Sequence, residues 1–386
     1  MATLTNTKIK DTYDGLLKTT DNDVIGASEK VITDGLGNAS VLSIGTGSAS
    51  FSSDIEVNGL TIGKGVNDVS TNTAFGFQAL ENATGGSNTA IGYGSLLDNT
   101  TGVQNTALGT STLRYNTTGS YNVAIGGQSL DANTEGRYNT AVGYVSLSSN
   151  TIGEFNTAIG SSSLALNTEG EFNTAIGTES LRSNTTGNNN IAIGYRSLYN
   201  TTTGGLNIAL GNNALFLNTT GYNNTAIGFH SLRANTIGYN NASVGIYSLD
   251  ANTEGAQNTA LGYSALTSNT TGDSNVAIGY DSLVANTTGD YNIGIGRFAG
   301  DTITTGSNNV YIGNEADASA NNVTNEIVIG ATATGNGSNT ATYGNSNITS
   351  HHFTSGQVNV TGNLAVDTNT LYVDAANNRV GIGTSS

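Results

Sequence analysis

Few residues in this chain belong to the types that catalyse reactions or bind metals. Its 386 residues include three histidines and no cysteine, which excludes thiolate nucleophiles, disulfides and cysteine-based metal sites. The serines fall largely at repeated positions and do not accompany a base and an orienting group in a recognisable set. We therefore expect no enzymatic activity, no catalytic residue and no cofactor.

The adjacent histidines His351 and His352 are weak candidates for a metal site. Imidazole is a good ligand for transition metals, and three chains around a common axis could bring three such side chains together. Neighbouring residues on a strand point to opposite faces, so only one of the pair could face that axis. Polar surface histidines are the simpler interpretation, and we predict no metal site.

Aromatic residues recur at a spacing of 17 in two rows that could contact carbohydrate. The first row consists of Tyr121, Tyr138, Phe155 and Phe172. The second row consists of Tyr93, Tyr144, Tyr195, Phe229, Tyr263 and Tyr280. Flat ring faces can bind host glycans, but cross-strand pairing that stiffens a sheet is the commoner role. We favour stiffening and keep glycan contact by the first row as the alternative.

Two polar patterns suggest other functions. Asn99-Thr100-Thr101 and its equivalents match the acceptor pattern for N-glycosylation. The threonines from Thr100 to Thr304 form a row that invites comparison with ice-binding solenoids. Asparagine and threonine beside a glycine are already explained by a tight turn, and a turn is a poor flat template. We predict neither sugar attachment nor ice binding.

All of these residues recur because the chain itself repeats. Asparagine returns every 17 residues from Asn88 to Asn309, and each unit reads approximately Asn-Thr-Ala-Ile-Gly-Tyr-x-Ser-Leu-x-x-Asn-Thr-Thr-Gly-x-x, as in residues 139–155. Such self-similarity is the signature of a solenoid. Glycine, asparagine and threonine form helices poorly, and the regular Ile and Leu positions argue against disorder. The prediction is an all-β fold, a parallel β-roll or β-solenoid with 17-residue coils.

Within one unit, numbered from Asn139 as position 1, alternation separates two faces. Positions 2 and 4 carry β-branched residues and are predicted to fill the coil interior together with Leu147 at position 9. Ala141 and Gly143, at positions 3 and 5, form a small-residue face that another backbone could approach. Gly153 at position 15 predicts a turn with positive φ. Stacked asparagines are expected to hydrogen-bond from coil to coil.

The thin column of coils predicts self-association. A single 17-residue coil encloses little apolar volume, so we expect a homotrimer that packs through the alanine and glycine face. Replacing Gly177 or Gly194 on that face by valine is predicted to abolish trimer assembly.

The two ends differ from the repeats. All five lysines precede residue 70, and apolar residues from Lys8 to Leu17 have helical spacing, which predicts a short amphipathic helix. The predicted regions are an N-terminal attachment or cap module (1–70), a β-roll shaft (72–345) and a C-terminal β segment (346–386) that leads to the distal tip or to a removed chaperone. Short strands separated by turns are expected in 31–40, 55–60, 362–367, 371–374 and 379–383.

Charge and hydropathy exclude several partners. The formal net charge is -16 and the pI is about 4.3, which disfavours binding to nucleic acid or to an anionic membrane surface. No basic segment is followed by an apolar one at the N-terminus, and no run approaches the roughly 18 apolar residues of a membrane span. We expect neither export by a signal peptide nor membrane insertion.

The repeated segments resemble known coils. Residues 88–96 and 258–266 resemble the Asn-x-Ala-Ile-Gly coils in the heads of trimeric autotransporter adhesins and similar coils in phage tail fibres. That resemblance covers residues 72 to about 345 and implies a left-handed parallel β-roll in a homotrimer. The 17-residue unit is longer than the adhesin repeat, most simply through its Asn-Thr-Thr-Gly turn. Segments 363–366, 371–374 and 378–384 look like the region that precedes a self-cleaving chaperone in many tail fibres.

This resemblance implies a structural and adhesive function. We expect a phage tail fibre in the virion, extracellular in its action, that attaches the phage to a bacterial host. Its expected partners are further copies of the chain, a phage tail or baseplate protein at the N-terminus, and a host cell-surface glycan or protein. Two alternatives remain: a bacterial trimeric surface adhesin, disfavoured because no export signal or membrane anchor is visible, and a self-assembling extracellular filament, whose exposed strand edges would join end to end.

Overall fold

The structure, a computed structural model, describes residues 60–65, 67 and 69–348, together with seven further strands nearer the two ends of the chain. The chain divides into two compact units, Met1–Asn345 and Ser346–Ser386. The described residues are all-β and contain no helix. The helix expected over Lys8 to Leu17, the strand expected over 362–367, and the pair His351 and His352 lie outside the described residues.

Small antiparallel sheets occur near both ends. Strands β1 (Lys18–Thr19), β2 (Lys30–Thr33), β3 (Ala39–Ile44) and β4 (Ala49–Phe51) form a four-stranded sheet in that order. In the second unit, β24 (Tyr372–Ala375) pairs antiparallel with β25 (Asn378–Gly381). The strands expected in 31–40, 371–374 and 379–383 are therefore confirmed, because alternating apolar residues between turn residues favour short hairpins.

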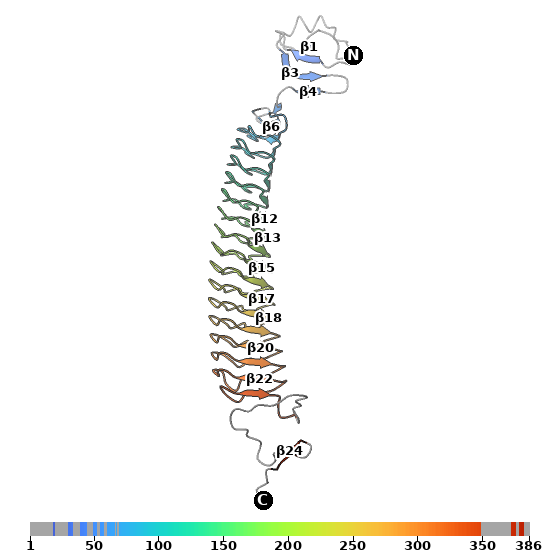
Figure 1. Cartoon of the computed structure of the whole chain (residues 1–386). Helices are drawn as coiled ribbons and strands as arrows, with labels where there is room; N and C mark the ends of the chain where they lie inside the picture. Colours follow the sequence, from blue (N-terminus) through green and yellow to red (C-terminus); the bar gives the residue numbers. More distant parts are fainter. Residues whose placement is uncertain are drawn as a thin grey trace, which may run out of the picture. The chain divides into compact units, whose positions relative to one another are not determined.

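The repeats form a parallel β-solenoid (Figure 1). An antiparallel hairpin of β5 (Ile55–Val57) and β6 (Leu60–Gly63) leads into β7 (Thr73–Gly76), and from β7 onward each strand pairs in parallel with the next. The following strands are β8 (Thr89–Ile91), β9 (Thr106–Leu108), β10 (Val123–Ile125), β11 (Thr140–Val142), β12 (Thr157–Ile159), β13 (Thr174–Ile176), β14 (Ile191–Ile193), β15 (Ile208–Leu210), β16 (Thr225–Ile227), β17 (Ala242–Val244), β18 (Thr259–Leu261), β19 (Val276–Ile278), β20 (Ile293–Ile295), β21 (Val310–Ile312), β22 (Ile327–Ile329) and β23 (Ala341–Tyr343).

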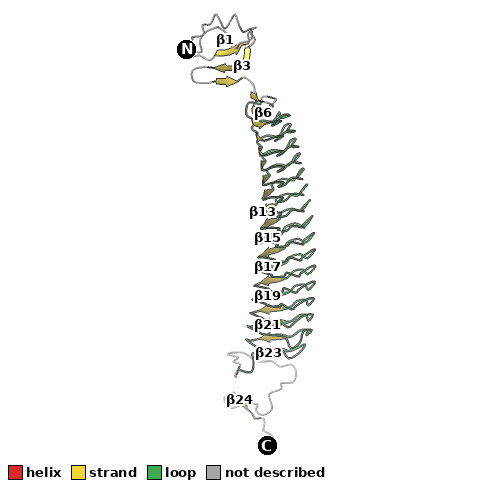
Figure 2. Ribbon diagram, turned by 180° about the vertical axis from the view of Figure 1, so that it is seen from behind, coloured by secondary structure: helices red, strands yellow, loops and turns green. Residues whose placement is uncertain are grey.

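The register of this sheet follows the sequence period. From β8 to β22 each residue pairs with the residue 17 positions later, as Ala124 does with Ala141. The last step is shorter, because Ile327 pairs with Ala341. Figure 2 shows the strands along one flank of the coils and the loops along the opposite flank. The predicted 17-residue coils and their shortening toward residue 340 are confirmed.

The coil interior is narrower than the sequence suggested. Leu147 at position 9 is fully buried, as predicted, but it packs in the same buried cluster as Ala141 at position 3. The β-branched positions 2 and 4 point outward instead, and Ile159 at position 4 is 39% exposed. The predicted assignment of the two faces is therefore wrong. Buried asparagine, serine and leucine already fill the cross-section and leave room for a methyl group at position 3.

The glycines have different roles from those predicted. Gly143 has a φ of +136°, and a Cβ there would lie 2.5 Å from the carbonyl oxygen of Gly160 in the next coil. Gly177 and Gly194 meet the following coil in the same way. This face therefore contacts the chain's own backbone and not another chain. Gly153 does not have the predicted positive φ; a Cβ there would lie 2.5 Å from Asn150 Oδ1.

Each regular coil turns its corners at non-glycine residues in the left-handed region. In the coil from Asn139 these are Val145, Leu147 and Phe155, with φ of 58°, 51° and 56°. This conformation costs roughly 1 kcal/mol or more for a residue with a Cβ. Coil-to-coil hydrogen bonds offset the strain: the amides of Leu147 and Phe155 donate to carbonyls of adjacent coils at 2.9 and 3.1 Å.

Candidate functional site

Two buried asparagine ladders hold the coils together. At position 1, the backbone amide of Asn139 donates to Asn122 Oδ1 at 2.9 Å, and its own Nδ2 donates to the Gly153 carbonyl at 2.8 Å. At position 12, Asn150 Nδ2 donates to Asn133 Oδ1 at 2.8 Å and to the same Gly153 carbonyl at 3.0 Å. The predicted asparagine ladders are confirmed, and they also close each coil.

These ladders account for the glycosylation-like and ice-binding-like patterns. The acceptor asparagine Asn99 is fully buried, so the folded chain does not present it to a glycosylating enzyme. The neighbouring Thr100 donates its hydroxyl to the Thr117 carbonyl at 2.9 Å, and Thr117 does the same to Thr134. Hydroxyls engaged between coils are not free to order water, which supports the structural interpretation of both patterns.

The most unusual surface is the outward face of the strands. We call the position-4 residues the outward row. They are Ile91, Leu108, Ile125, Val142, Ile159, Ile176, Ile193, Leu210, Ile227, Val244, Leu261, Ile278, Ile295, Ile312 and Ile329. Eleven of them are between 36% and 48% exposed. Contiguous apolar patches of this extent are rare on soluble monomers and mark interaction sites.

Position 2 lies beside the outward row on the same face. It is threonine in many coils, but it is apolar at Val123, Ile191 and Ile208, which are 36–37% exposed. The apolar surface is therefore wider in some coils than in others. Alternation along a strand identifies two faces without showing which of them is inside, so this surface could not be recognised from the sequence.

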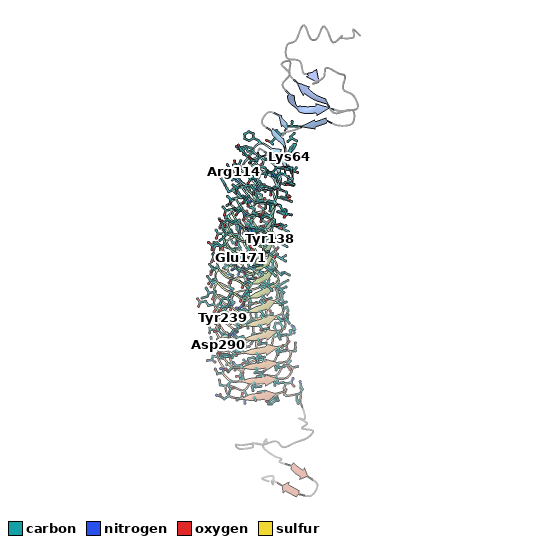
Figure 3. All side chains as sticks on the ribbon, turned by 45° about the horizontal axis from the view of Figure 1, so that its top comes forward. Lys64, Arg114, Tyr138, Glu171, Tyr239 and Asp290 are labelled. Atoms are coloured by element: carbon teal, nitrogen blue, oxygen red, sulfur yellow. The ribbon has the colours of Figure 1, made fainter. Side chains whose placement is uncertain are left out.

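The first aromatic row is a continuous stack (Figure 3 labels Tyr138). Its ring centroids are 4.8–4.9 Å apart, with interplanar angles of 3–8°. The four rings are 43–51% exposed. Face-to-face stacking covers the ring faces and leaves the edges in solvent, so a sugar could stack only on an outer face of Tyr121 or Phe172. The geometry supports stiffening, and glycan contact by this row stays a prediction.

The second aromatic row is interrupted. Within it Tyr263 stacks on Tyr280 with centroids 5.2 Å apart, and Phe229 stacks on the neighbouring His230 at 3.9 Å. Tyr144 is 61% exposed. This row offers isolated rings and pairs in place of one platform.

Charged side chains on the described coils pair between neighbouring coils. Arg196 Nε lies 2.6 Å from Glu179 Oε2, and Arg233 Nε lies 2.7 Å from Asp250 Oδ1. Side-chain hydrogen bonding to these carboxylates is the main cause of the raised pKa of both arginines. Exposed pairs of this kind add little stability. The turn residues Glu135, Glu169 and Glu254 are exposed, as expected for solvated turn charges.

The coils that contain Gly300, Tyr311 and Glu326, which we call the C-terminal coils, have a different interior. Tyr311 replaces the position-3 alanine and is fully buried. Gly300 replaces the position-9 leucine, and a Cβ there would lie 2.6 Å from Tyr311 Cδ2. Glu326 replaces the ladder asparagine and is also fully buried. Its carboxyl oxygens accept hydrogen bonds from the amides of Gly337 and Ser319 and from the Tyr311 hydroxyl, at 2.9, 3.2 and 3.3 Å.

Acidic groups in this region have perturbed ionisation. Burial, the charge of Asp317 and a hydrogen bond to it raise the pKa of Asp301 to about 6. Burial and the neighbouring Glu326 raise the pKa of Tyr311 above its ordinary range, so the phenol stays neutral. Asp317 also accepts from the Thr302 amide at 3.1 Å. The hydrogen bond from Thr302 to Asp317 joins two neighbouring coils.

The described coils present no arrangement suited to metal binding. No group of three or more His, Asp or Glu side chains among the described residues could hold a metal ion. The part of the chain that the structure describes also lacks a helix long and apolar enough to span a bilayer. Comparison with known protein families finds no matching family model, and comparison with curated proteins finds no match. The outward row is the candidate functional surface because of its exposed apolar side chains.

Proposed function

We propose that this chain is a non-enzymatic structural fibre that acts as a homotrimer in a phage tail and attaches the virion to a bacterial host. The observation that carries the proposal is the outward row. Fifteen aliphatic side chains stand in one line on a solenoid, and stacked coils about 4.8 Å apart make this line roughly 67 Å long.

The exposed area is large enough for a stable assembly. With about 60 Å² of apolar surface per residue, the outward row leaves on the order of 900 Å² in water. A standard interface buries roughly 800 Å² per partner, and each chain of a trimer makes two such interfaces, so the position-2 residues must contribute area as well. The copies accordingly pack through positions 2 and 4, in place of the alanine and glycine face that the sequence suggested.

The beginning of the solenoid favours a fibre over an open filament. β6 pairs antiparallel with β7, so the parallel edge of the first coil is covered by a hairpin. Solenoids polymerise end to end when such edges are bare. The acidic chain and the resemblance of the repeats to tail-fibre coils support the tail fibre. A bacterial trimeric surface adhesin remains the second candidate, because the repeats also resemble the coils of adhesin heads.

Attachment in this proposal depends on multiplicity. The N-terminal region binds a tail or baseplate protein, and the shaft holds the receptor-binding end away from the virion. Three identical chains present three copies of any weak contact with a host glycan or protein, which raises the effective affinity without a new type of contact.

Electron microscopy of the purified chain, with sedimentation equilibrium, tests the assembly. Discrete rods of fixed length with a three-fold cross-section and a trimer mass are expected. Indefinite end-to-end filaments, or a monomer at micromolar concentration, would contradict the fibre. Labelled rods are then applied to a panel of bacteria: binding to a subset of strains is expected, and binding to none would contradict host attachment while leaving the assembly intact.

A further inference from the structure

Identical copies of a repeat protein can pair with their coils shifted along the axis, so a correct assembly needs a feature that aligns them. The position-2 residues vary from coil to coil and could provide that feature. In the outward row every coil carries an aliphatic residue, so two copies shifted by one coil, about 4.8 Å, would still match Ile, Leu or Val against its like. The row that provides the interface therefore does not define the axial alignment of the copies. Some less regular feature of the same face must do so.

Position 2 supplies such a feature. It is Ile or Val in seven coils from β8 to β22 and Thr or Ala in the others. The seven are Val123, Ile191, Ile208, Val276, Ile293, Val310 and Ile327. Their spacing is uneven: one isolated residue, then an adjacent pair, then a run of four. Uneven spacing distinguishes one alignment from every shifted one.

A second landmark coincides with the first. Phe172 ends the stacked aromatic row at position 17, and Asn189 follows it in the next coil. At the same step, position 2 changes from Thr174 to Ile191. Positions 17 and 2 flank the buried ladder asparagine and are both exposed or partly exposed. Position 17 therefore changes from Phe to Asn at the same step at which position 2 changes from Thr to Ile.

We propose that the position-2 row sets the axial register of this chain against its other copies, which are parallel and aligned coil to coil. The proposal rests on the proposed homotrimer. In the aligned state all seven apolar residues meet their like. After a shift by one coil only four of the seven do, and the others meet Thr or Ala. In the aligned state apolar residues meet apolar residues and threonine hydroxyls meet threonine hydroxyls, with which they can form hydrogen bonds. A shift instead places some hydroxyls against Ile or Val, where they lose water without gaining a partner.

The absence of cysteine from the chain permits a direct measurement. Thr186→Cys places one spin label per chain on an exposed position-14 turn, away from the strand face. Electron–electron distance measurements on the intact assembly are expected to give one narrow distance, because three aligned copies are related by rotation alone. If the labelled chain with its position-2 residues unchanged gives several distances between spin labels, the proposal is overturned.

The matched variant removes the isolated residue and the adjacent pair, so that a shift by one coil loses one match in place of three, and it keeps the outward row. Val123→Thr, Ile191→Thr and Ile208→Thr place at three exposed sites the residue that position 2 already carries elsewhere, so the solenoid is expected to fold with an unchanged circular dichroism spectrum. A second population of distances is expected in this variant. An unchanged single distance in this variant, and in one that also carries Thr at positions 276, 293, 310 and 327, would show that position 2 does not set the register. Sedimentation equilibrium separates these results from failure of the trimer, because a monomer would refute the proposed assembly itself.

Discussion

The regular coils and the C-terminal coils solve the same packing problem in different ways. In a regular coil the small Ala141 and the large Leu147 pack in the same buried cluster. Asn139 closes the coil through its hydrogen bond to the Gly153 carbonyl. In the C-terminal coils the sizes are exchanged: Tyr311 fills the interior, Gly300 makes room for it, and Glu326 takes the ladder position. The two solutions conserve volume and hydrogen bonding, which are what a close-packed interior requires.

The difference shows what limits the repeat. A repeated ladder satisfies every polar group only while each coil supplies the same partner. Where the position-12 asparagine is replaced by Thr201 and by Ile303, the Oδ1 atoms of Asn184 and Asn286 have no hydrogen-bond partner. Where the position-1 asparagine becomes Glu326, new backbone donors replace the lost amide. Departures from the repeat are therefore either compensated locally or left as weak points.

The largest expected effect is in the regular coils. Gly177→Val places a Cβ 2.7 Å from the Gly194 carbonyl oxygen at a φ of +128°, so we expect a loss of more than about 3 kcal/mol and failure to fold. The variant is measured by circular dichroism and thermal melting. Loss of trimer with an intact solenoid would instead restore the idea that this glycine faces another chain.

A matched control uses a glycine with space around it. Gly94 has a φ of +60°, and apart from its chain neighbours no atom lies within 4 Å of the place that a Cβ would occupy. Gly94→Asn is expected to change stability by less than about 0.5 kcal/mol, because asparagine tolerates the left-handed region.

A substitution of Glu326 tests whether the packing of the C-terminal coils depends on this one side chain. Glu326→Ala leaves the amides of Ser319 and Gly337 without acceptors, and we expect a local loss of about 3 kcal/mol. Hydrogen exchange of residues 319–343 is then roughly 100-fold faster, since 1.4 kcal/mol corresponds to tenfold. The exposed Glu315→Ala is the control. Equal exchange in both variants would mean that Glu326 does not organise these coils.

Thr201 offers a gain of stability in the regular region. Thr201→Asn restores the residue that position 12 carries in the neighbouring coils. It supplies a donor for the unpartnered Asn184 Oδ1 while keeping an acceptor for Asn218 Nδ2. A net hydrogen bond contributes about 1 kcal/mol, so a higher urea midpoint is expected. Asn150→Thr, which creates the same break in an intact ladder, is expected to lower it. If Thr201→Asn is no more stable than the parent, the break in the asparagine ladder at Thr201 does not weaken the solenoid.

The smallest effect concerns pH in the C-terminal coils. Because the folded chain raises the pKa of Asp301 from 3.8 to about 6, folding favours the protonated carboxyl. This contribution is fully present below about pH 4 and is lost as the pH rises through 6. Exchange protection of the C-terminal coils, corrected for intrinsic rates, is expected to fall between about pH 4 and 6 and to level off above that. Asp301→Asn is expected to remove this dependence, and an identical dependence in the variant would assign it to another group.

The aromatic rows illustrate a site that sequence spacing located only in part. A spacing of 17 was enough to predict that the rings of Tyr121, Tyr138, Phe155 and Phe172 would stack, and they do. Which part of each ring meets solvent depends on the stacking angle. That angle follows from how close the coils lie, and spacing along the chain does not contain it.

The sequence was enough to predict the period, the all-β class, the buried Leu147 and the asparagine ladders around Asn139, because stacked coils satisfy a fixed spacing of hydrogen-bonding and apolar residues. Tertiary structure decided which face is inside. Alternation defines two faces of a strand, but only the width of the closed coil shows that alanine fits within it and isoleucine does not. The same closure decides that Gly143, and not Gly153, has positive φ, and it leaves the outward row in solvent.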